Sequence, residues 1–291
     1  ISPTWFYDAQ GSALFERLGE TPEYYLTRTE LGILRDHRVE IAAALGSHVA
    51  LIEPGSGAIV KTRLLLDVLR DPWVYVPVDV ARAALFAAAP RVREDYPQLR
   101  VQPVCADFAR SFELPWSVIK GARRRVVYFP GSTIGNFERD EAVGLLRNFS
   151  RIVSPDGAVV LGIDRVKPAG LLQRAYDDAA GVTAAFNLNA LRHLNAELGA
   201  TFDLAAFEHE AIWDEARERI EMRLVARRST RFGIGPSEFA LGRGDYLLTE
   251  YSQKYSLDSV ADIVAAAGFR IEQVWSDRSD WFSVLLLEPA G

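Results

Sequence analysis

The chain has 291 residues, of which 49% are hydrophobic and 25% charged, as expected for a globular protein with a substantial core. Its formal net charge of −6 excludes the broad positive surface of a nucleic-acid-binding protein. A single cysteine, Cys105, excludes a disulfide within the chain, and no two histidines have a metal-ligand spacing, so we predict no metal site. No apolar segment reaches membrane-spanning length and no signal peptide is visible, so we expect a cytoplasmic protein without a membrane partner, and a monomer.

Strands and helices alternate in the first part of the chain. The predicted strands are 48–55, 73–80, 99–108, 123–132 and 157–164, and the predicted helices are 59–70, 81–92 and 139–153. The strands are short, rich in valine and apolar on both faces, which is typical of a parallel sheet covered by helices. The alternation therefore predicts an open, doubly wound α/β sheet.

The pattern changes after residue 166. Residues 169–199 indicate one or two helices, and 208–232 indicate two strands joined by a charged turn. The chain then ends with a predicted helix at 257–269, stopped at Gly268, and with strands at 270–277 and 281–289. Two final strands separated by a short loop predict a hairpin at the sheet edge. That ending is typical of class I methyltransferases that use S-adenosylmethionine (SAM), and dinucleotide dehydrogenases lack it.

These patterns predict an α/β protein of two domains. The first is a methyltransferase domain with a Rossmann-like seven-stranded sheet, formed by residues 30–166 and 255–291. The second is an α+β substrate-binding domain, inserted late in the sheet and joined by the N-terminal segment, formed by residues 1–29 and 167–254.

The first predicted strand runs into the loop EPGSG, from Glu53 to Gly57. Its two glycines permit a tight turn and a close approach of backbone to a ligand, whereas the full GxGxxG motif is absent. The acid Glu53 suits the positively charged SAM better than it suits a pyrophosphate. A glycine turn with a helix cap explains the same residues, so this loop alone does not distinguish a cofactor-binding loop from a plain turn.

Acidic residues also end the next two strands, where Asp79 closes VPVDV and Asp107 closes VCADF before Phe108. An acid at the second strand accepts hydrogen bonds from ribose hydroxyls in such folds, and these strand ends line the ligand crevice of open α/β sheets. The position of Asp107 commonly contacts adenine in SAM enzymes. Solvated strand caps remain the alternative for each acid singly.

The fourth strand ends in FPGSTIGNF (129–137), which lacks the N/D-P-P-Y/F motif of methyltransferases acting on nucleic-acid bases or glutamine. Gly131 and Asn136 belong to this loop of small residues, whose backbone N–H groups and side-chain amide can bind a carboxylate or an amine. A plain strand-to-helix loop is the alternative.

Several long motifs resemble one family. They are TPEYYLTRTELGIL, EPGSG with KTRLLL, GSTIGNF, RAYDDAAGVTAAFNLNAL, RIEMRL and LTEYSQKYS. From about Tyr7 to its end the chain closely resembles the histidine-specific Nα-methyltransferases of ergothioneine biosynthesis. The resemblance implies SAM-dependent trimethylation of the α-amine of L-histidine to hercynine.

The resemblance also implies roles for individual residues. Asn136 and Tyr176 are the predicted catalytic residues, because they contact the amino-acid head and the carboxylate of the substrate. A tyrosine of PEYY contacts the carboxylate too; the spacing from Phe15 favours Tyr24, with Tyr25 the alternative, and Tyr7 lines the pocket. The remaining substrate residues are Glu250 and Ser252, which hold the imidazole, and Met222, which packs nearby or belongs to the core.

The predicted cofactor residues combine the resemblance with the first loop. They are Glu53, Gly55, Ser56, Gly57, Lys61, Asp79, Asp107, Phe108 and Gly131. The sequence departs from the family at Pro54, where many relatives have leucine, and carries Tyr251 and Gln253 at variable positions. Two other functions stay open: N-methylation of another amino acid or aromatic amine, and SAM binding without catalysis.

Overall fold

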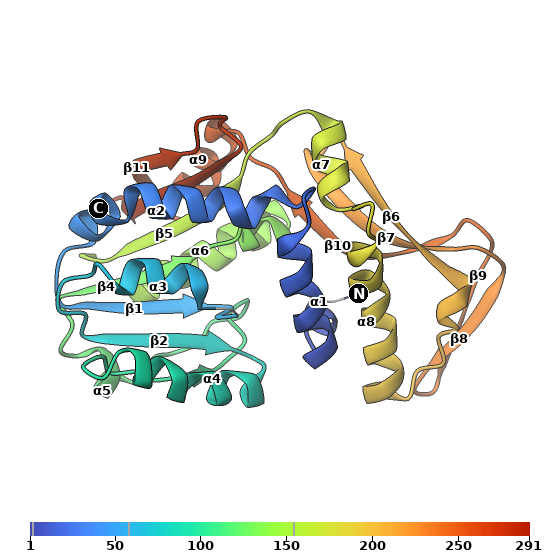
Figure 1. Ribbon diagram of the computed structural model, residues 1–291, viewed down its shortest axis with the longest axis horizontal. Helices are drawn as coiled ribbons and strands as arrows, with labels where there is room; N and C mark the ends of the chain where they lie inside the picture. The colour runs from blue at the N-terminus through green and yellow to red at the C-terminus, as the bar shows by residue number, and fades with distance from the viewer. Residues whose placement is uncertain (2, 58, 154) are drawn as a thin grey trace. The chain divides into compact units, whose positions relative to one another are not determined.

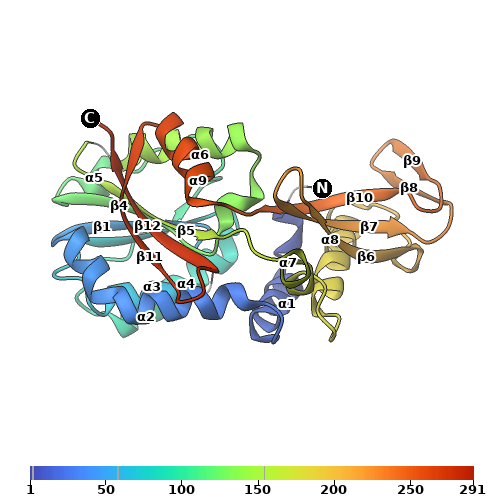
Figure 2. The ribbon, with the colours of Figure 1, turned by 90° about the horizontal axis from the view of Figure 1, so that it is seen from above.

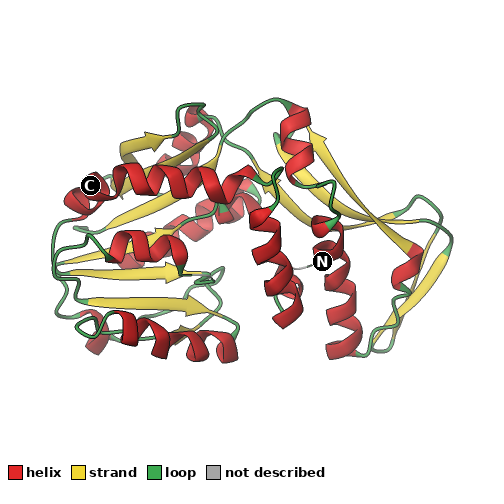
Figure 3. Ribbon diagram, viewed as in Figure 1, coloured by secondary structure: helices red, strands yellow, loops and turns green. Residues whose placement is uncertain are grey.

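The structure is a computed structural model that describes residues 1, 3–57, 59–153 and 155–291. The chain divides into two compact units. Unit 1 comprises Ile1–Arg28 and Val166–Lys254, and unit 2 comprises Thr29–Arg165 and Tyr255–Gly291. Helices and strands occur in both units (Figures 1 and 3).

Unit 2 contains a seven-stranded sheet in the order β11-β12-β5-β4-β1-β2-β3. Its strands are β1 (Val49–Pro54), β2 (Val74–Asp79), β3 (Val104–Cys105), β4 (Arg124–Phe129), β5 (Ala158–Asp164), β11 (Phe269–Ser276) and β12 (Phe282–Pro289). Strands β1 to β5 pair in parallel, and β12 pairs antiparallel with both β5 and β11. The predicted seven-stranded sheet and its closing edge hairpin are therefore confirmed.

Helices cover both faces of this sheet (Figure 2). One layer contains α2 (Tyr25–Leu45), α3 (Val60–Leu66) and α4 (Arg82–Asp95), and the other contains α5 (Trp116–Ile119), α6 (Arg139–Val153) and α9 (Leu257–Ala266). In β1, Val49 and Leu51 pack under the first layer, while Ala50 and Ile52 pack under the second. Burial of each large aliphatic side chain contributes about 1.5–3 kcal/mol, which explains why the central strands β1, β4 and β5 are mostly apolar.

The ends of α9 follow local sequence signals. Ser256 and Ser259 form a reciprocal capping box at its N-terminus. Gly268 has a φ of 82°, a left-handed conformation that glycine adopts without steric cost, so the predicted glycine stop is confirmed.

The third predicted strand was too long. Tyr75 exchanges backbone hydrogen bonds with Arg100 and Gln102, but β3 itself covers only Val104–Cys105. Pro103 separates the two paired segments. It has no N–H to donate to the ladder, so the pairing is interrupted there.

Unit 1 combines helices with antiparallel strands. Its helices are η1 (Pro3–Phe6), α1 (Ala9–Glu20), α7 (Ala169–Ala175), α8 (Val182–Leu198) and η3 (Leu204–Ala206). One sheet has the order β10 (Tyr246–Gln253), β7 (Arg219–Ala226) and β6 (Phe207–Asp214), and β8 (Thr230–Ile234) pairs with β9 (Ser237–Leu241). The two strands predicted within 208–232 are confirmed as β6 and β7, whereas β8, β9 and β10 were not predicted. Leu191 and Leu194 of α8 pack against the sheet at Phe207 and Leu224.

Across the described part of the chain, no helix has both the length and the apolar character needed to cross a bilayer.

Candidate active site

Three acids follow adjacent strands of unit 2. Because β1, β2 and β3 are parallel neighbours, their carboxyl ends lie at one edge of the sheet. Backbone bonds join these ends: Gly55 N donates to Val78 O at 2.8 Å, and Ala106 N donates to Asp79 O at 3.2 Å. The structure thus brings together the strand ends that carry Glu53, Asp79 and Asp107.

The loop after β1 has the features of a ligand-binding turn. Gly55 has a φ of 69°, and a Cβ atom there would lie 3.3 Å from the ring of Phe108. The buried Ser56 hydroxyl has no hydrogen-bond partner among the described residues. A buried hydroxyl without a partner is costly, and a polar ligand that supplied one would remove that cost. The loop therefore fits a ligand with polar groups, such as the predicted cofactor.

Glu53 is held inside the unit. It is 4% exposed; Thr62 Oγ1 donates to both of its carboxylate oxygens at 2.8 Å, and Tyr75 Oη donates to one at 2.5 Å. Burial raises the pKa of Glu53 to about 7, although the hydrogen bonds and the charge of Lys61 act in the opposite direction. Its role as a cofactor residue stays a prediction; the contacts present in the structure anchor the end of β1.

The raised pKa of Glu53 predicts a pH-dependent stability. Its normal value is 4.5, so between pH 4.5 and about 7 the folded protein binds more protons than the unfolded chain, and stability falls as pH rises. A shift of this size corresponds to about 3 kcal/mol. Glu53→Gln should abolish this part of the pH dependence, measured by urea denaturation across that range. The exposed Glu238→Gln serves as the control, and an unchanged slope in Glu53→Gln would refute the assignment.

A buried ion pair connects α2, α3 and the loop after β4. Lys61 Nζ lies 2.5 Å from Glu30 Oε2, and Gly131 N donates to the two oxygens of Glu30 at 2.9 and 3.0 Å. Glu30 is 1% exposed, and Gly131 has a φ of 79°. The structure thus brings two predicted cofactor residues, Lys61 and Gly131, together around Glu30. We did not select Glu30 from the sequence, although it lies within the motif TPEYYLTRTELGIL.

The other two acids keep acceptor capacity. Asp79 is half-buried and accepts one hydrogen bond from Ala81 N at 2.8 Å, and burial raises its pKa. Asp107 is exposed and accepts from Ala109 N at 3.0 Å, with Arg110 Nε at 3.3 Å. A carboxylate can accept about four hydrogen bonds, so both acids could also accept hydroxyl or amine hydrogens of a ligand.

Asn136 is half-buried at the end of the short helix η2 (Thr133–Asn136) in unit 2. The preceding Ser132 has a left-handed backbone, with a φ of 57°, and its Oγ accepts from Asp164 N at 2.8 Å. This bond ties the loop to the end of β5, so that the small residues of GSTIGN have a fixed backbone.

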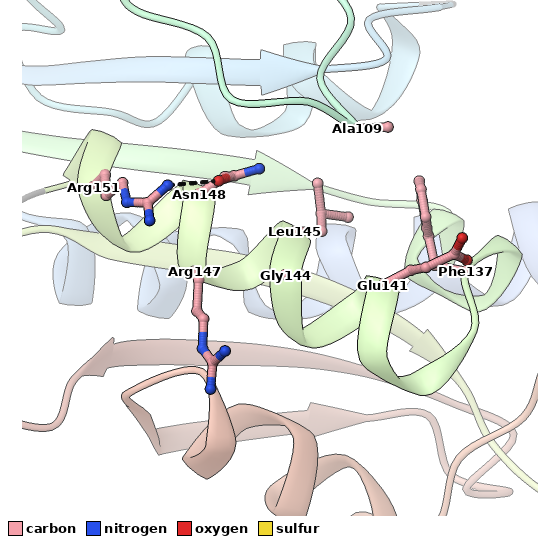
Figure 4. A pocket seen from close by; sticks show the side chains of 8 residues that line it. All are labelled: Ala109, Phe137, Glu141, Gly144, Leu145, Arg147, Asn148 and Arg151. Atoms are coloured by element: carbon pink, nitrogen blue, oxygen red, sulfur yellow. Dashed lines mark hydrogen bonds between the residues drawn. The ribbon is translucent and has the colours of Figure 1, made fainter.

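A separate hollow of about 370 Å³ runs along α6 in unit 2 (Figure 4). Phe137, Leu145 and Asn148 are among its lining residues, and Arg151 Nη1 donates to Asn148 Oδ1 at 3.1 Å. The ring of Phe137 lies 6.5 Å from that of Phe108. None of the predicted site residues lines this hollow, and we assign it no ligand.

A row of aromatic rings in unit 1 connects the predicted substrate tyrosines. Successive ring centroids lie 5.7 Å apart for Tyr7 and Phe15, 6.4 Å for Phe15 and Tyr24, and 6.0 Å for Tyr24 and Tyr176. Tyr25 lies in a different environment: it is 1% exposed, and its hydroxyl accepts from Lys167 Nζ at 2.8 Å. The contact with Tyr176 therefore favours Tyr24 over Tyr25 as the substrate residue.

Strand β10 presents the predicted imidazole residues. Side chains two positions apart share one face of a strand, so Glu250 and Ser252 point to the same side of β10. Met222 is the cross-strand partner of Glu250 and is 2% exposed. Ser252 Oγ accepts from Tyr176 Oη at 2.9 Å. The structure thus brings together Tyr176, which directly follows α7, with Met222 of β7 and with Glu250 and Ser252 of β10.

His209 supports Tyr176 from β6. Its Nε2 donates to Tyr176 O at 2.8 Å, and its Nδ1 accepts from Asn187 Nδ2 at 2.8 Å. Burial lowers the pKa of His209, so the ring is neutral near pH 7. No sequence signal pointed to this contact, because the histidine stands alone and its partner belongs to another motif.

Asp178 caps α8 beside Tyr176. Its carboxylate is 4% exposed and accepts from Val182 N, Thr183 N and Thr183 Oγ1 at 2.9, 2.7 and 2.6 Å. Burial raises the pKa of Asp178, but these hydrogen bonds outweigh it and the net pKa is lowered. The cap fixes the start of the helix that follows the tyrosine.

We expect Asp178→Ala to destabilise the protein by about 2 kcal/mol, because helix donors lose a buried, charged acceptor. The neighbouring Asp177→Ala, at an exposed position, should change stability by less than about 0.5 kcal/mol. Urea denaturation of both variants measures the difference. Similar losses in the two variants would contradict the capping role.

Comparisons with known proteins agree with these features. A family described as "Histidine-specific methyltransferase, SAM-dependent" matches residues 1–289. The histidine N-alpha-methyltransferase of Mycolicibacterium smegmatis is 42% identical over 98% of this chain and 89% of its own length. That of Mycobacterium tuberculosis is 40% identical with the same coverage.

The fold is also found among solved structures. A SAM-dependent methyltransferase from Clostridium acetobutylicum superimposes with a TM-score of 0.52, covering 89% of this chain and 92% of its own, at 11% sequence identity. This likeness supports the class I methyltransferase fold alone. The family match over almost the whole length, with relatives that are 40% and 42% identical, confirms the resemblance seen in the sequence: the chain belongs to the family of histidine-specific, SAM-dependent methyltransferases.

Proposed function

We propose that this protein transfers methyl groups from SAM to the α-amine of L-histidine, giving the trimethylated betaine hercynine as the first step of ergothioneine biosynthesis. The observation that carries the proposal is that Glu250 and Ser252 lie on the same side of β10, where Ser252 is hydrogen-bonded to Tyr176. It rests further on the family to which the chain belongs.

The β10 residues match the hydrogen-bonding pattern of a neutral imidazole. Such a ring offers one N–H donor and one bare nitrogen acceptor. The carboxylate of Glu250 can accept from the N–H, and the hydroxyl of Ser252 can donate to the bare nitrogen. Met222 supplies a soft apolar surface beside the ring. A phenyl or indole side chain would leave at least one of these polar groups unpaired, at a cost of about 1–3 kcal/mol.

We assign the amino-acid head of histidine to Tyr24 and Asn136. The ring of Tyr176 lies beside that of Tyr24, but its hydroxyl hydrogen is donated to Ser252 Oγ, so the same hydrogen is not available to the carboxylate. Hydroxyl and amide groups bind a carboxylate without adding a formal positive charge, which would disfavour a positively charged product nearby. The reaction needs a neutral α-amine as nucleophile, and free amines lose a proton at mildly alkaline pH, so positioning supplies much of the catalysis. The product has no N–H left, so the residues around the nitrogen should not require one.

We assign the cofactor to unit 2. When bound, SAM supplies an electrophilic methyl group on a sulfonium. Asp79 would accept from the ribose hydroxyls, Asp107 from the adenine amine, and Phe108 would pack on the adenine ring. Lys61, held by Glu30, would pair with the carboxylate of the methionine part, close to Gly131. Ser56 would find in the ligand the hydrogen-bond partner that its hydroxyl lacks among the described residues.

An acceptor panel tests the proposal. We expect the kcat/KM for L-histidine to exceed that for phenylalanine, tryptophan and other amino acids by at least about 100-fold, since unpaired polar groups penalise the wrong side chain. A better acceptor among the other amino acids or aromatic amines would reassign the substrate. Tight SAM binding by calorimetry, with no transfer to any amine, would instead indicate a non-catalytic binding protein.

A further inference from the structure

A buried lysine contacts two of the predicted substrate residues, Tyr176 and Ser252. Lys254 follows β10 and is fully buried, with an exposed fraction of 0%. Its Nζ donates to Tyr176 Oη at 2.8 Å and to Ser252 Oγ at 2.9 Å, and Tyr176 Oη donates to Ser252 Oγ at 2.9 Å. The three side chains thus form a closed triangle within unit 1, and every contact in it is between polar atoms.

The direction of these hydrogen bonds follows from the chemistry of the three groups. A lysine ammonium only donates, so both hydroxyl oxygens act as acceptors towards Lys254. Ser252 Oγ then accepts two hydrogen bonds, one from Lys254 and one from Tyr176, and these use its two lone pairs. Ser252 can interact with a further group only through its own hydroxyl hydrogen, which is not hydrogen-bonded to any of the described residues.

We propose that Lys254 is a positioning residue that fixes Ser252 as a hydrogen-bond donor to the substrate ring. This proposal rests on the proposed function, and it explains how the site would select the side chain of the substrate. Ser252 donates to the bare nitrogen of a neutral imidazole, while Glu250, on the same side of β10, accepts from the N–H. Side chains without an acceptor atom at that place leave the Ser252 hydrogen unpaired.

The chain contains a matched control for this arrangement. Lys167 is 8% exposed, and its Nζ donates to a tyrosine hydroxyl, that of Tyr25, at 2.8 Å. It is thus a second buried lysine bonded to a tyrosine in unit 1, and that tyrosine is not part of the triangle. Replacing Lys167 therefore measures how the loss of a buried lysine affects KM and stability when the lysine is bonded to a different tyrosine.

A double-mutant cycle tests the inference. The variants are Ser252→Ala, Lys254→Met and the double variant, with the KM and kcat for L-histidine and the free energy of unfolding measured for each. We expect each single variant to raise KM by about 10-fold, and the double variant to raise it by no more, because both changes remove the same directed hydrogen bond. The kcat should change less than threefold, roughly, since the bond is made equally in the ground and transition states.

The control cycle combines Lys167→Met with Ser252→Ala. There the effects on KM should multiply, because the hydrogen bond from Lys167 to Tyr25 lies outside the triangle of Lys254, Tyr176 and Ser252. Lys254→Gln keeps an N–H donor, so its KM should lie between those of wild type and Lys254→Met. If Lys254→Met does not fold, Lys254→Gln takes its place in the cycle.

The outcomes separate this inference from the proposed function. If the wild-type protein does not methylate histidine, the proposed function fails, and the inference fails with it. If wild type methylates histidine but the effects of Ser252→Ala and Lys254→Met multiply to about 100-fold, the proposed function stands and Lys254 has only a structural role. An unchanged KM in Lys254→Met would overturn the inference as well.

Discussion

Glu250→Ala is expected to raise the KM for L-histidine by about 100-fold, because a carboxylate that accepts from a ligand N–H contributes about 1.5–3 kcal/mol. The dissociation constant of the cofactor should change less than twofold, roughly, since Glu250 belongs to unit 1 and the proposed cofactor residues to unit 2. Steady-state kinetics gives the KM, and calorimetry with S-adenosylhomocysteine gives the cofactor affinity.

Two further variants sharpen this test. Glu250→Gln keeps the size and one acceptor atom, so it should lose less affinity than the alanine variant. Glu238→Ala removes an exposed acid from β9 in the same unit and should leave both ligands unaffected. A comparable loss of histidine and cofactor affinity in Glu250→Ala would show that the division of labour between the units is wrong.

Asp79→Ala is expected to have the reverse effect. It should weaken cofactor binding by about 100-fold, because a carboxylate that accepts from two ribose hydroxyls makes two charge-assisted hydrogen bonds. It should leave the binding of histidine unchanged to within about twofold, as for sites without shared contacts. Calorimetric titrations with each ligand separately measure both quantities.

The control for this variant is Asp262→Ala, which removes an exposed acid from α9 in unit 2. It should bind both ligands as the wild type does. Asp79→Asn retains one acceptor atom and should be intermediate. Wild-type cofactor affinity in Asp79→Ala would exclude the strand-end acids as the ribose site.

The parallel sheet could be predicted because its physical cause is local. Strands such as Val49–Pro54 are buried on both faces, so most positions select an apolar residue and the pattern is visible in the sequence. Strand β10 gives no such pattern, since it is only partly buried and carries tyrosine, glutamate and glutamine. Its motif could be recognised as a family feature, but its secondary structure could not be predicted from composition.

The supporting residues of the site were harder to predict because their partners are remote in the sequence. Glu30 and Gly131 are 101 residues apart, and Lys254 and Tyr176 are 78 apart. A buried acid or lysine is acceptable only where the fold supplies such partners, and neither residue has a local signal. Glu53 shows the converse: its place at a strand end was predicted, but its hydrogen bonds with Thr62 and Tyr75 follow from packing within unit 2.

The most direct test of the proposed chemistry is to locate the transferred methyl groups. The protein is incubated with L-histidine and SAM, and the products are followed over time by tandem mass spectrometry. The proposed chemistry gives species with one, two and then three added methyl groups, all on the α-nitrogen, with an unmodified imidazole. Methyl groups on a ring nitrogen, or no methylated histidine while another amine is methylated, would contradict it.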